Sequence, residues 1–98
     1  MESLIIEATK SSPLIDFKAD TGILRIEGES YPENAAKFYK PVLNWVKRFL
    51  LEGKPDVVAE ILVRYMNTSS SKCMMTFLEM LDESRDDNII SVNWRYEK

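Results

Sequence analysis

Histidine is absent from this sequence, and its absence argues against several kinds of active site at once. Histidine is the commonest general base, the commonest metal ligand and the side chain that titrates near neutral pH. A serine nucleophile would therefore lack its usual activating base. The three glycines, at 22, 28 and 53, cannot form a glycine-rich phosphate-binding loop, and no CxxC, HExxH or GxSxG pattern occurs. We expect no enzyme activity, no cofactor and no metal.

Cysteine and clustered positive charge are also scarce. The single cysteine, Cys73, excludes an internal disulfide, and its helical spacing among apolar residues favours a small buried hydrophobe over a nucleophile. The formal net charge is −3, and the longest basic grouping is Lys47-Arg48, so the basic face that a nucleic-acid binder needs is missing. No basic polar face for a membrane-surface helix occurs either. We therefore expect neither a nucleic-acid nor a membrane partner.

Long apolar runs are missing too. The start, Met1 to Leu4, lacks the basic residues and apolar run of a signal peptide, and no stretch approaches the ~20 residues that span a membrane. A cytoplasmic location is the default expectation. What remains is an ordinary globular composition, with 98 residues that are 45% hydrophobic and 30% charged. This length predicts one domain over residues 1–98.

The apolar patterns predict an α/β fold with the order βββαβαβ. We expect strands at 4–8, 14–18, 23–27, 57–66 and 89–96, and helices at 35–50 and 73–81. The run 57–66 is interpreted as a central strand, although its length also fits a helix. Strands joined through helices favour parallel neighbours, so we predict a single mixed sheet of about five strands with both helices packed against it. Leu24 and Ile26 share one face of their strand, and the mixed opposite face predicts a partly covered sheet.

A short loop leads into the first helix. Pro32 suits the first helical turn, where the missing N–H is not needed. Ser30 or Tyr31 would then lie near the cap, with Glu33 complementing the positive helix start. Pro41 interrupts the helical pattern and is expected to bend the helix.

Four consecutive hydroxyl residues follow the central strand. Thr68, Ser69, Ser70 and Ser71 precede Lys72 at the start of the second helix. Thr68 or Ser69 would cap this helix by accepting a bond from a first-turn amide, worth about 1 kcal/mol. Four hydroxyls exceed what one cap requires. A helix start also favours an added phosphate, because its N–H groups are free and its partial charge is positive. Lys72, one turn in, would lean toward that phosphate.

Three functional interpretations follow from these residues. The favoured one is a binding protein switched by phosphorylation of Thr68, with the helix-start edge of the sheet as its contact surface. The second is a constitutive structural or dimerising module in which Thr68 only caps a helix. The third is a small enzyme of unknown type, which would need a pocket with convergent polar groups.

The segment from Tyr31 to Asn34 either only enters the first helix or shares the contact surface with the Thr68 loop. Helix starts that follow parallel strands meet at one sheet edge, which favours the shared surface. The candidate partner-binding residues are Tyr31, Pro32, Glu33, Asn34, Asn67, Ser69, Ser70 and Lys72.

Two segments resemble the SiaC family of bacterial regulatory phosphoproteins. The first is Ser30–Asn34, followed by Phe38-Tyr39, Pro41 and Trp45, and the second is Asn67–Lys72. The resemblance covers nearly the whole chain and includes the late Trp94-Arg95-Tyr96. It implies a fold similar to anti-sigma-factor antagonist (STAS-like) domains and a partner-switching role in biofilm signalling.

The resemblance also implies specific partners. Family members are phosphorylated by a dedicated serine/threonine kinase and dephosphorylated by a PP2C-type phosphatase. In the unmodified state they bind and activate a diguanylate cyclase, which raises cyclic di-GMP. The family's phosphothreonine matches Thr68. Family members usually continue past the last strand with an acidic stretch and more helix, whereas this sequence ends at Glu97-Lys98. A partner surface built from such a tail is therefore not expected here.

Overall fold

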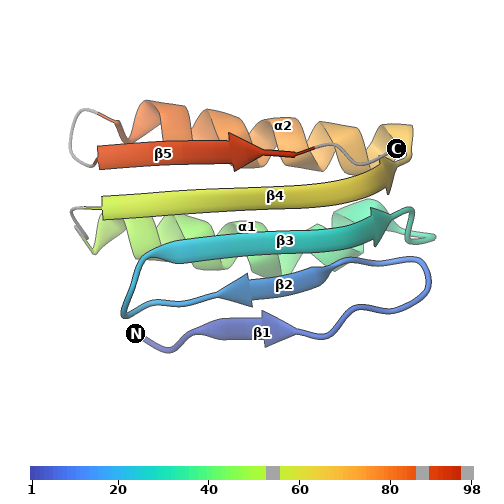
Figure 1. Cartoon of the computed structure of the whole chain (residues 1–98), viewed down its shortest axis with the longest axis horizontal. Helices are drawn as coiled ribbons and strands as arrows, with labels where there is room; N and C mark the ends of the chain where they lie inside the picture. The colour runs from blue at the N-terminus through green and yellow to red at the C-terminus, as the bar shows by residue number, and fades with distance from the viewer. Residues whose placement is uncertain (53–55, 86–88, 96–98) are drawn as a thin grey trace.

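One mixed sheet and two helices form the structure, which is a computed structural model that describes residues 1–52, 56–85 and 89–95. The strands are β1 (Leu4–Ile6), β2 (Leu14–Phe17), β3 (Ile23–Ser30), β4 (Asp56–Met66) and β5 (Ile89–Trp94), and the helices are α1 (Ala35–Leu51) and α2 (Thr68–Glu83). The sheet order is β1-β2-β3-β4-β5 (Figure 1). The first three strands pair antiparallel, whereas β4 is parallel to both β3 and β5. The predicted α/β class and the βββαβαβ order are confirmed.

The strand β3 is longer than the sequence predicted. It runs to Ser30, although residues 28–30 were expected to be loop. The extension is stabilised by parallel pairing with the end of β4, where Ser30 lies opposite Met66. Gly28 adopts a φ of 121°, which side chains rarely tolerate, so glycine suits this position. The expected end of the last strand, Tyr96, lies outside the described residues, and β5 ends at Trp94.

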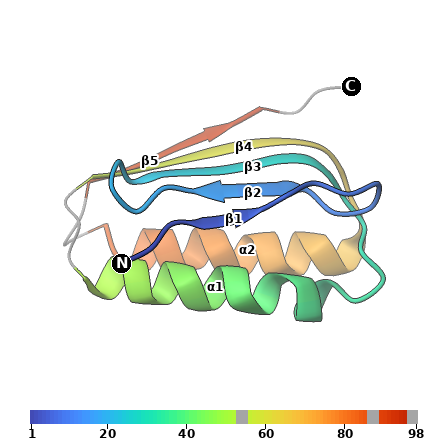
Figure 2. The same ribbon diagram turned by 90° about the horizontal axis from the view of Figure 1, so that it is seen from below.

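Both helices lie on the same face of the sheet and leave the other face open (Figure 2). Buried and less buried side chains alternate along β4 as a result, because successive residues of a strand point to opposite faces of the sheet. Val57, Ala59, Ile61 and Val63 are buried toward the helices. The partly covered sheet that the sequence predicted is thus confirmed, as is the central-strand interpretation of 57–66.

The helix α1 presents one apolar stripe to the sheet. Tyr39, Val42, Val46 and Phe49 are buried at helical spacing, and each such side chain contributes roughly 1.5–3 kcal/mol by leaving water. Pro41 lies on the exposed side of a helix that continues as one element from Ala35 to Leu51. Within the described ranges, no helix is long and apolar enough to cross a membrane.

Aromatic rings close the core between α1, α2 and the sheet. Phe17 stacks on Phe77 at 5.9 Å between ring centroids and also contacts Trp45 at 5.4 Å. The indole N–H of Trp45 donates to the carbonyl of Glu2, which ties the N-terminal segment to α1. Cys73 packs against this core but is only half-buried, so the burial that the sequence predicted is partial. This partial burial raises the pKa of the Cys73 thiol.

Candidate functional site

The two segments singled out from the sequence meet at one end of the sheet, where β3 and β4 finish side by side (Figure 1). The backbone N–H of Asn67 donates to the carbonyl of Ser30 at 3.0 Å. The rings of Tyr31 and Tyr65 pack edge to face with centroids 5.7 Å apart. Since β3 and β4 are parallel, the chain leaves both strands at the same edge. The expected meeting of these segments at one sheet edge is confirmed.

Asparagine side chains cap both helices, and this corrects two expectations. Asn34 Oδ1 accepts from the N–H of Lys37 at 3.1 Å, so α1 begins after Pro32 rather than at it. Asn67 Oδ1 accepts from the N–H of Ser70 at 2.8 Å, so neither Thr68 nor Ser69 is the cap of α2. Asparagine is preferred at this position at least as strongly as threonine, because its short amide reaches the third helical N–H.

A buried chain of hydroxyl groups links three elements beneath this edge. Ser30 Oγ donates to Ser70 Oγ at 2.9 Å and lies 2.6 Å from Tyr39 Oη. Because the single Ser30 proton goes to Ser70, the phenol of Tyr39 is the donor to Ser30. Both serines are fully buried. Burial is the main cause that raises the pKa of Tyr39. The start of α2 is therefore held firmly against β3 and α1.

The four hydroxyls at 68–71 are not equivalent in the folded protein. Thr68 and Ser69 are exposed, Ser71 is half-buried and Ser70 is fully buried. The sequence analysis placed Ser70 among the partner-binding residues, but the structure buries its side chain, which holds the helix start through its bond with Ser30. Within the described part of the chain, the Thr68 hydroxyl makes no hydrogen bond. Thr68 is thus accessible to a modifying enzyme.

The charge around Thr68 suits an added phosphate. The first turn of α2 carries no acidic residue, and the helix dipole places partial positive charge there. Lys72 is exposed one turn further along and makes no ion pair within the described ranges. Residues four apart on a helix are neighbours, so Lys72 is free to approach a phosphate on Thr68.

Tyr65 belongs to this edge, although sequence reasoning missed it. The pairing of β3 with β4 shifts between Gly28 and Glu29, so that Tyr65 lies opposite Glu29. Its side chain is 52% exposed and is held by the ring of Tyr31. The only hint in the sequence was an aromatic residue two positions before the cap Asn67. Among the described residues no cluster of side chains is suited to hold a metal ion.

The single mixed sheet, with both helices on one face, defines a small α/β domain consistent with the STAS-like arrangement. Residues 6–98 match the model of the SiaC family of regulatory phosphoproteins. The chain belongs to the SiaC family.

Similar proteins come from Pseudomonas aeruginosa. A protein of strain UCBPP-PA14 is 36% identical over 99 residues, which cover 100% of this chain and 79% of that protein. The crystal structure of apo-SiaC has a TM-score of 0.93 at 36% identity, covering 99% of this chain and 81% of that one. A structure of the diguanylate cyclase SiaD in complex with its activator SiaC matches with a TM-score of 0.74 at 27% identity, covering 96% of this chain and 99% of that one.

Proposed function

We propose that this chain is a non-enzymatic signalling protein that binds and regulates a diguanylate cyclase in biofilm and cyclic di-GMP signalling. It acts as one regulatory domain over residues 1–98, in the cytoplasm and without a cofactor. Two findings support this proposal. The chain belongs to a family of regulatory phosphoproteins, and a similar chain of Pseudomonas aeruginosa is the activator in a complex with the cyclase SiaD.

Phosphorylation of Thr68 is the proposed switch, placed by a protein kinase and removed by a PP2C-type phosphatase. The observation that carries it is the exposed, unbonded Thr68 hydroxyl on a helix start whose cap is already supplied by Asn67. A phosphate there adds about −1.5 to −2 charges and three acceptor oxygens. The helix start tolerates this charge, so the domain stays folded while its outer surface changes.

The contact surface lies around Thr68 and has contributions from both strand ends. The exposed or half-buried residues predicted to touch the partner are Tyr31, Pro32, Glu33, Asn34, Asn67, Ser69 and Lys72. The ring of Tyr65 extends this set on the open side of the sheet. A partner docked here would lie within reach of a phosphate on Thr68, so the modification would control its binding.

Calorimetry with purified Pseudomonas aeruginosa SiaD tests the switch. We expect Thr68→Ala to bind as the unmodified protein does and Thr68→Glu to bind at least about tenfold more weakly, because the added charge is fixed at the contact surface. Thr76→Glu is the matched control, since Thr76 is exposed on the same helix two turns away and should leave the affinity unchanged. Equal affinity for all variants would favour a constitutive module instead.

A further inference from the structure

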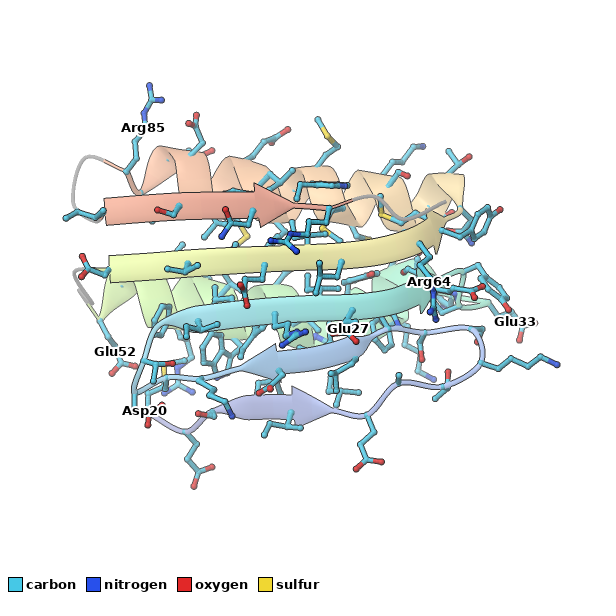
Figure 3. The ribbon with its side chains drawn as sticks, in the orientation of Figure 1. Asp20, Glu27, Glu33, Glu52, Arg64 and Arg85 are labelled. Carbon is cyan, nitrogen blue, oxygen red and sulfur yellow. The ribbon has the colours of Figure 1, made fainter. Side chains whose placement is uncertain are left out.

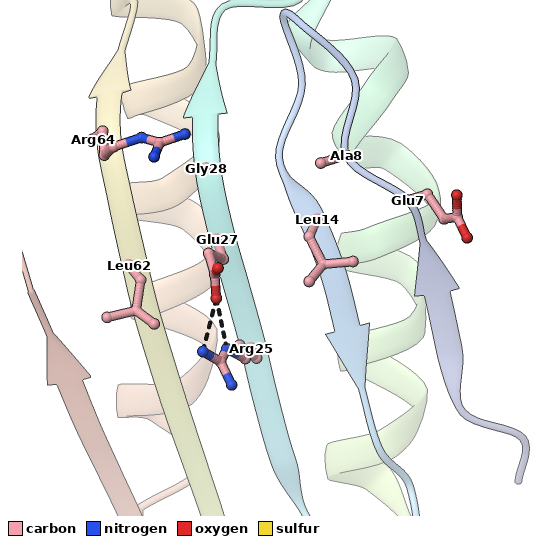
Figure 4. A pocket seen from close by; sticks show the side chains of 8 residues that line it. All are labelled: Glu7, Ala8, Leu14, Arg25, Glu27, Gly28, Leu62 and Arg64. Carbon is pink, nitrogen blue, oxygen red and sulfur yellow. Dashed lines mark hydrogen bonds and ion pairs between the residues drawn. The ribbon is translucent and has the colours of Figure 1, made fainter.

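The open face of the sheet carries a hollow that Arg64 borders on the side of the β4 end (Figure 4). Its volume is about 550 Å³, within the range of ordinary binding sites. Its lining residues are Glu7, Ala8, Leu14, Arg25, Glu27, Gly28, Leu62 and Arg64. The helices lie behind the sheet in this view, so the hollow is on the opposite face from the apolar core.

A bulge in β4 sets the shape of this hollow. Gly28 pairs with Val63, but the next residue of β3, Glu29, pairs with Tyr65, so Arg64 is an extra residue in β4. Bulges of this kind re-aim side chains and are common next to functional sites. In Figure 4 the guanidinium of Arg64 extends from β4 toward β3 near Gly28, which contributes only backbone. A ligand can therefore approach closely beneath this guanidinium.

The bulge also joins the hollow to the Thr68 edge. Ser30 faces the helices and is buried, so its neighbour Glu29 faces the open side, and Tyr65 opposite Glu29 faces the same way. Arg64 and Tyr65 consequently follow one another on the open face, just before the cap Asn67. The hollow and the Tyr31–Tyr65 ring pair thus lie along one stretch of the open face, and Thr68 follows Tyr65 by three residues at the same end of the sheet.

The charges of the hollow are unevenly matched. Arg25 binds Glu27 through two nitrogens, with Nη2 at 2.7 Å and Nε at 3.0 Å from Oε1, so this pair is neutral as a unit. Arg64 makes no ion pair with Glu29 or with any other residue that the structure describes. In Figure 4 the carboxylate of Glu7 points away from the centre of the hollow. One guanidinium is therefore left free beside the apolar side chains of the hollow.

We propose that this hollow binds a segment of a protein partner in which an acidic residue lies next to an aliphatic residue. A carboxylate of the partner pairs with Arg64, and an adjacent aliphatic side chain packs over the backbone of Gly28 against Leu14. The inference rests on the proposed function in taking a protein as the partner. It adds the chemistry of that partner, and it explains release, because a phosphate on Thr68 would repel an acidic segment docked at the same end of the sheet.

An NMR titration of the unphosphorylated protein tests the hollow without a cyclase. The probe is an acetylated and amidated pentapeptide, Leu-Glu-Ala-Leu-Glu, and its counterpart has lysine in place of both glutamates. We expect the acidic peptide to shift the backbone amide signals of Gly28, Leu62 and Arg64 at low salt, and the effect to weaken as salt is added. The lysine peptide should leave these signals unchanged.

Matched variants make the outcome decisive. Arg64→Gln should weaken binding of the acidic peptide at least about fivefold, because a charge-assisted bond is lost. Arg48→Gln should have no effect, since Arg48 is an exposed arginine on α1, away from the open face. Equal shifts with both peptides, unchanged affinity of Arg64→Gln, or inorganic phosphate binding at the same residues as strongly as the peptide would overturn the proposal. None of these results would contradict the proposed switch at Thr68, because the calorimetry with SiaD tests that switch separately.

Discussion

Ser30 Oγ lies 2.9 Å from Ser70 Oγ, although 40 residues separate the two in the sequence. This bond and the phenol of Tyr39 connect the end of β3, the first turn of α2 and the second turn of α1. Thr68 is two residues before Ser70, so its backbone is held by a buried network while its side chain remains outside. The candidate switch is therefore an exposed hydroxyl on a firmly held backbone. In Figure 3, Glu33 and Arg64 lie at this end of the sheet.

Removing the phenolic oxygen of Tyr39 should destabilise the fold. Tyr39→Phe keeps the ring but leaves the buried Ser30 oxygen without its donor, which we expect to cost about 1–2 kcal/mol in the free energy of unfolding. Tyr65→Phe is the control, because the side chain of Tyr65 is half-exposed, and its change should stay within about 0.5 kcal/mol. Urea titration followed by circular dichroism measures both. A Tyr39→Phe variant as stable as the parent would show that the hydroxyl chain contributes nothing.

Alkaline pH should weaken the fold through the same residue. The pKa of Tyr39 is raised above its ordinary 10.0 mainly by burial, so the folded protein holds this proton more tightly than the unfolded chain. Stability from this group is complete below about pH 10 and is lost as the pH rises toward the folded pKa. Cys73 contributes to the loss of stability in the same direction, because burial also raises the pKa of its thiol above the ordinary 9.0.

The comparison that isolates Tyr39 is the slope of unfolding free energy against pH between about 9 and 11. Tyr39→Phe should show a shallower decline than the parent, since the contribution of Cys73 is common to both. Parallel declines would mean that Tyr39 does not titrate differently in the folded and unfolded states.

Loss of the α2 cap should loosen the helix start. Asn67→Ala removes the acceptor for the N–H of Ser70, and we expect a cost of about 1 kcal/mol. Hydrogen exchange at residues 68–71 should accelerate more than exchange in the middle of α2, because the change is local. Ser69→Ala is the control, since Ser69 is exposed and does not cap the helix. Similar exchange in both variants would argue against the capping role of Asn67.

Burial should restrict which hydroxyl a kinase can modify. Thr68 and Ser69 are exposed, whereas Ser70 is fully buried and would have to leave its bond with Ser30 to react. Phosphopeptide mapping of the protein isolated from growing cells should therefore find the phosphate on Thr68 and none on Ser70. Substituting Thr68→Ala should abolish the signal. Modification of Ser70 in the folded protein would contradict the firmly held helix start described above.

Local patterns carried much of the prediction of this fold. The β-branched run 57–66 and the helical spacing from Ala35 to Leu50 depend on neighbours only a few residues away, and the structure follows both. The caps were assigned wrongly, because Ser, Thr and Asn are all good caps and sequence alone does not say which residue has the extended backbone. The length of β3 was also missed, since its last residues are held by pairing with β4 rather than by their own propensity.

The sequence by itself determined the order of elements, the buried stripe of each helix and a hydroxyl-rich helix start, because these follow from the spacing of apolar side chains. Only the tertiary structure decided which hydroxyl is exposed, and it also decided that the Arg64 bulge lies beside Gly28. The reason is that both depend on contacts between residues about 35 to 40 positions apart. Such contacts exist only after β4 has paired with β3 and both helices have packed on the same face.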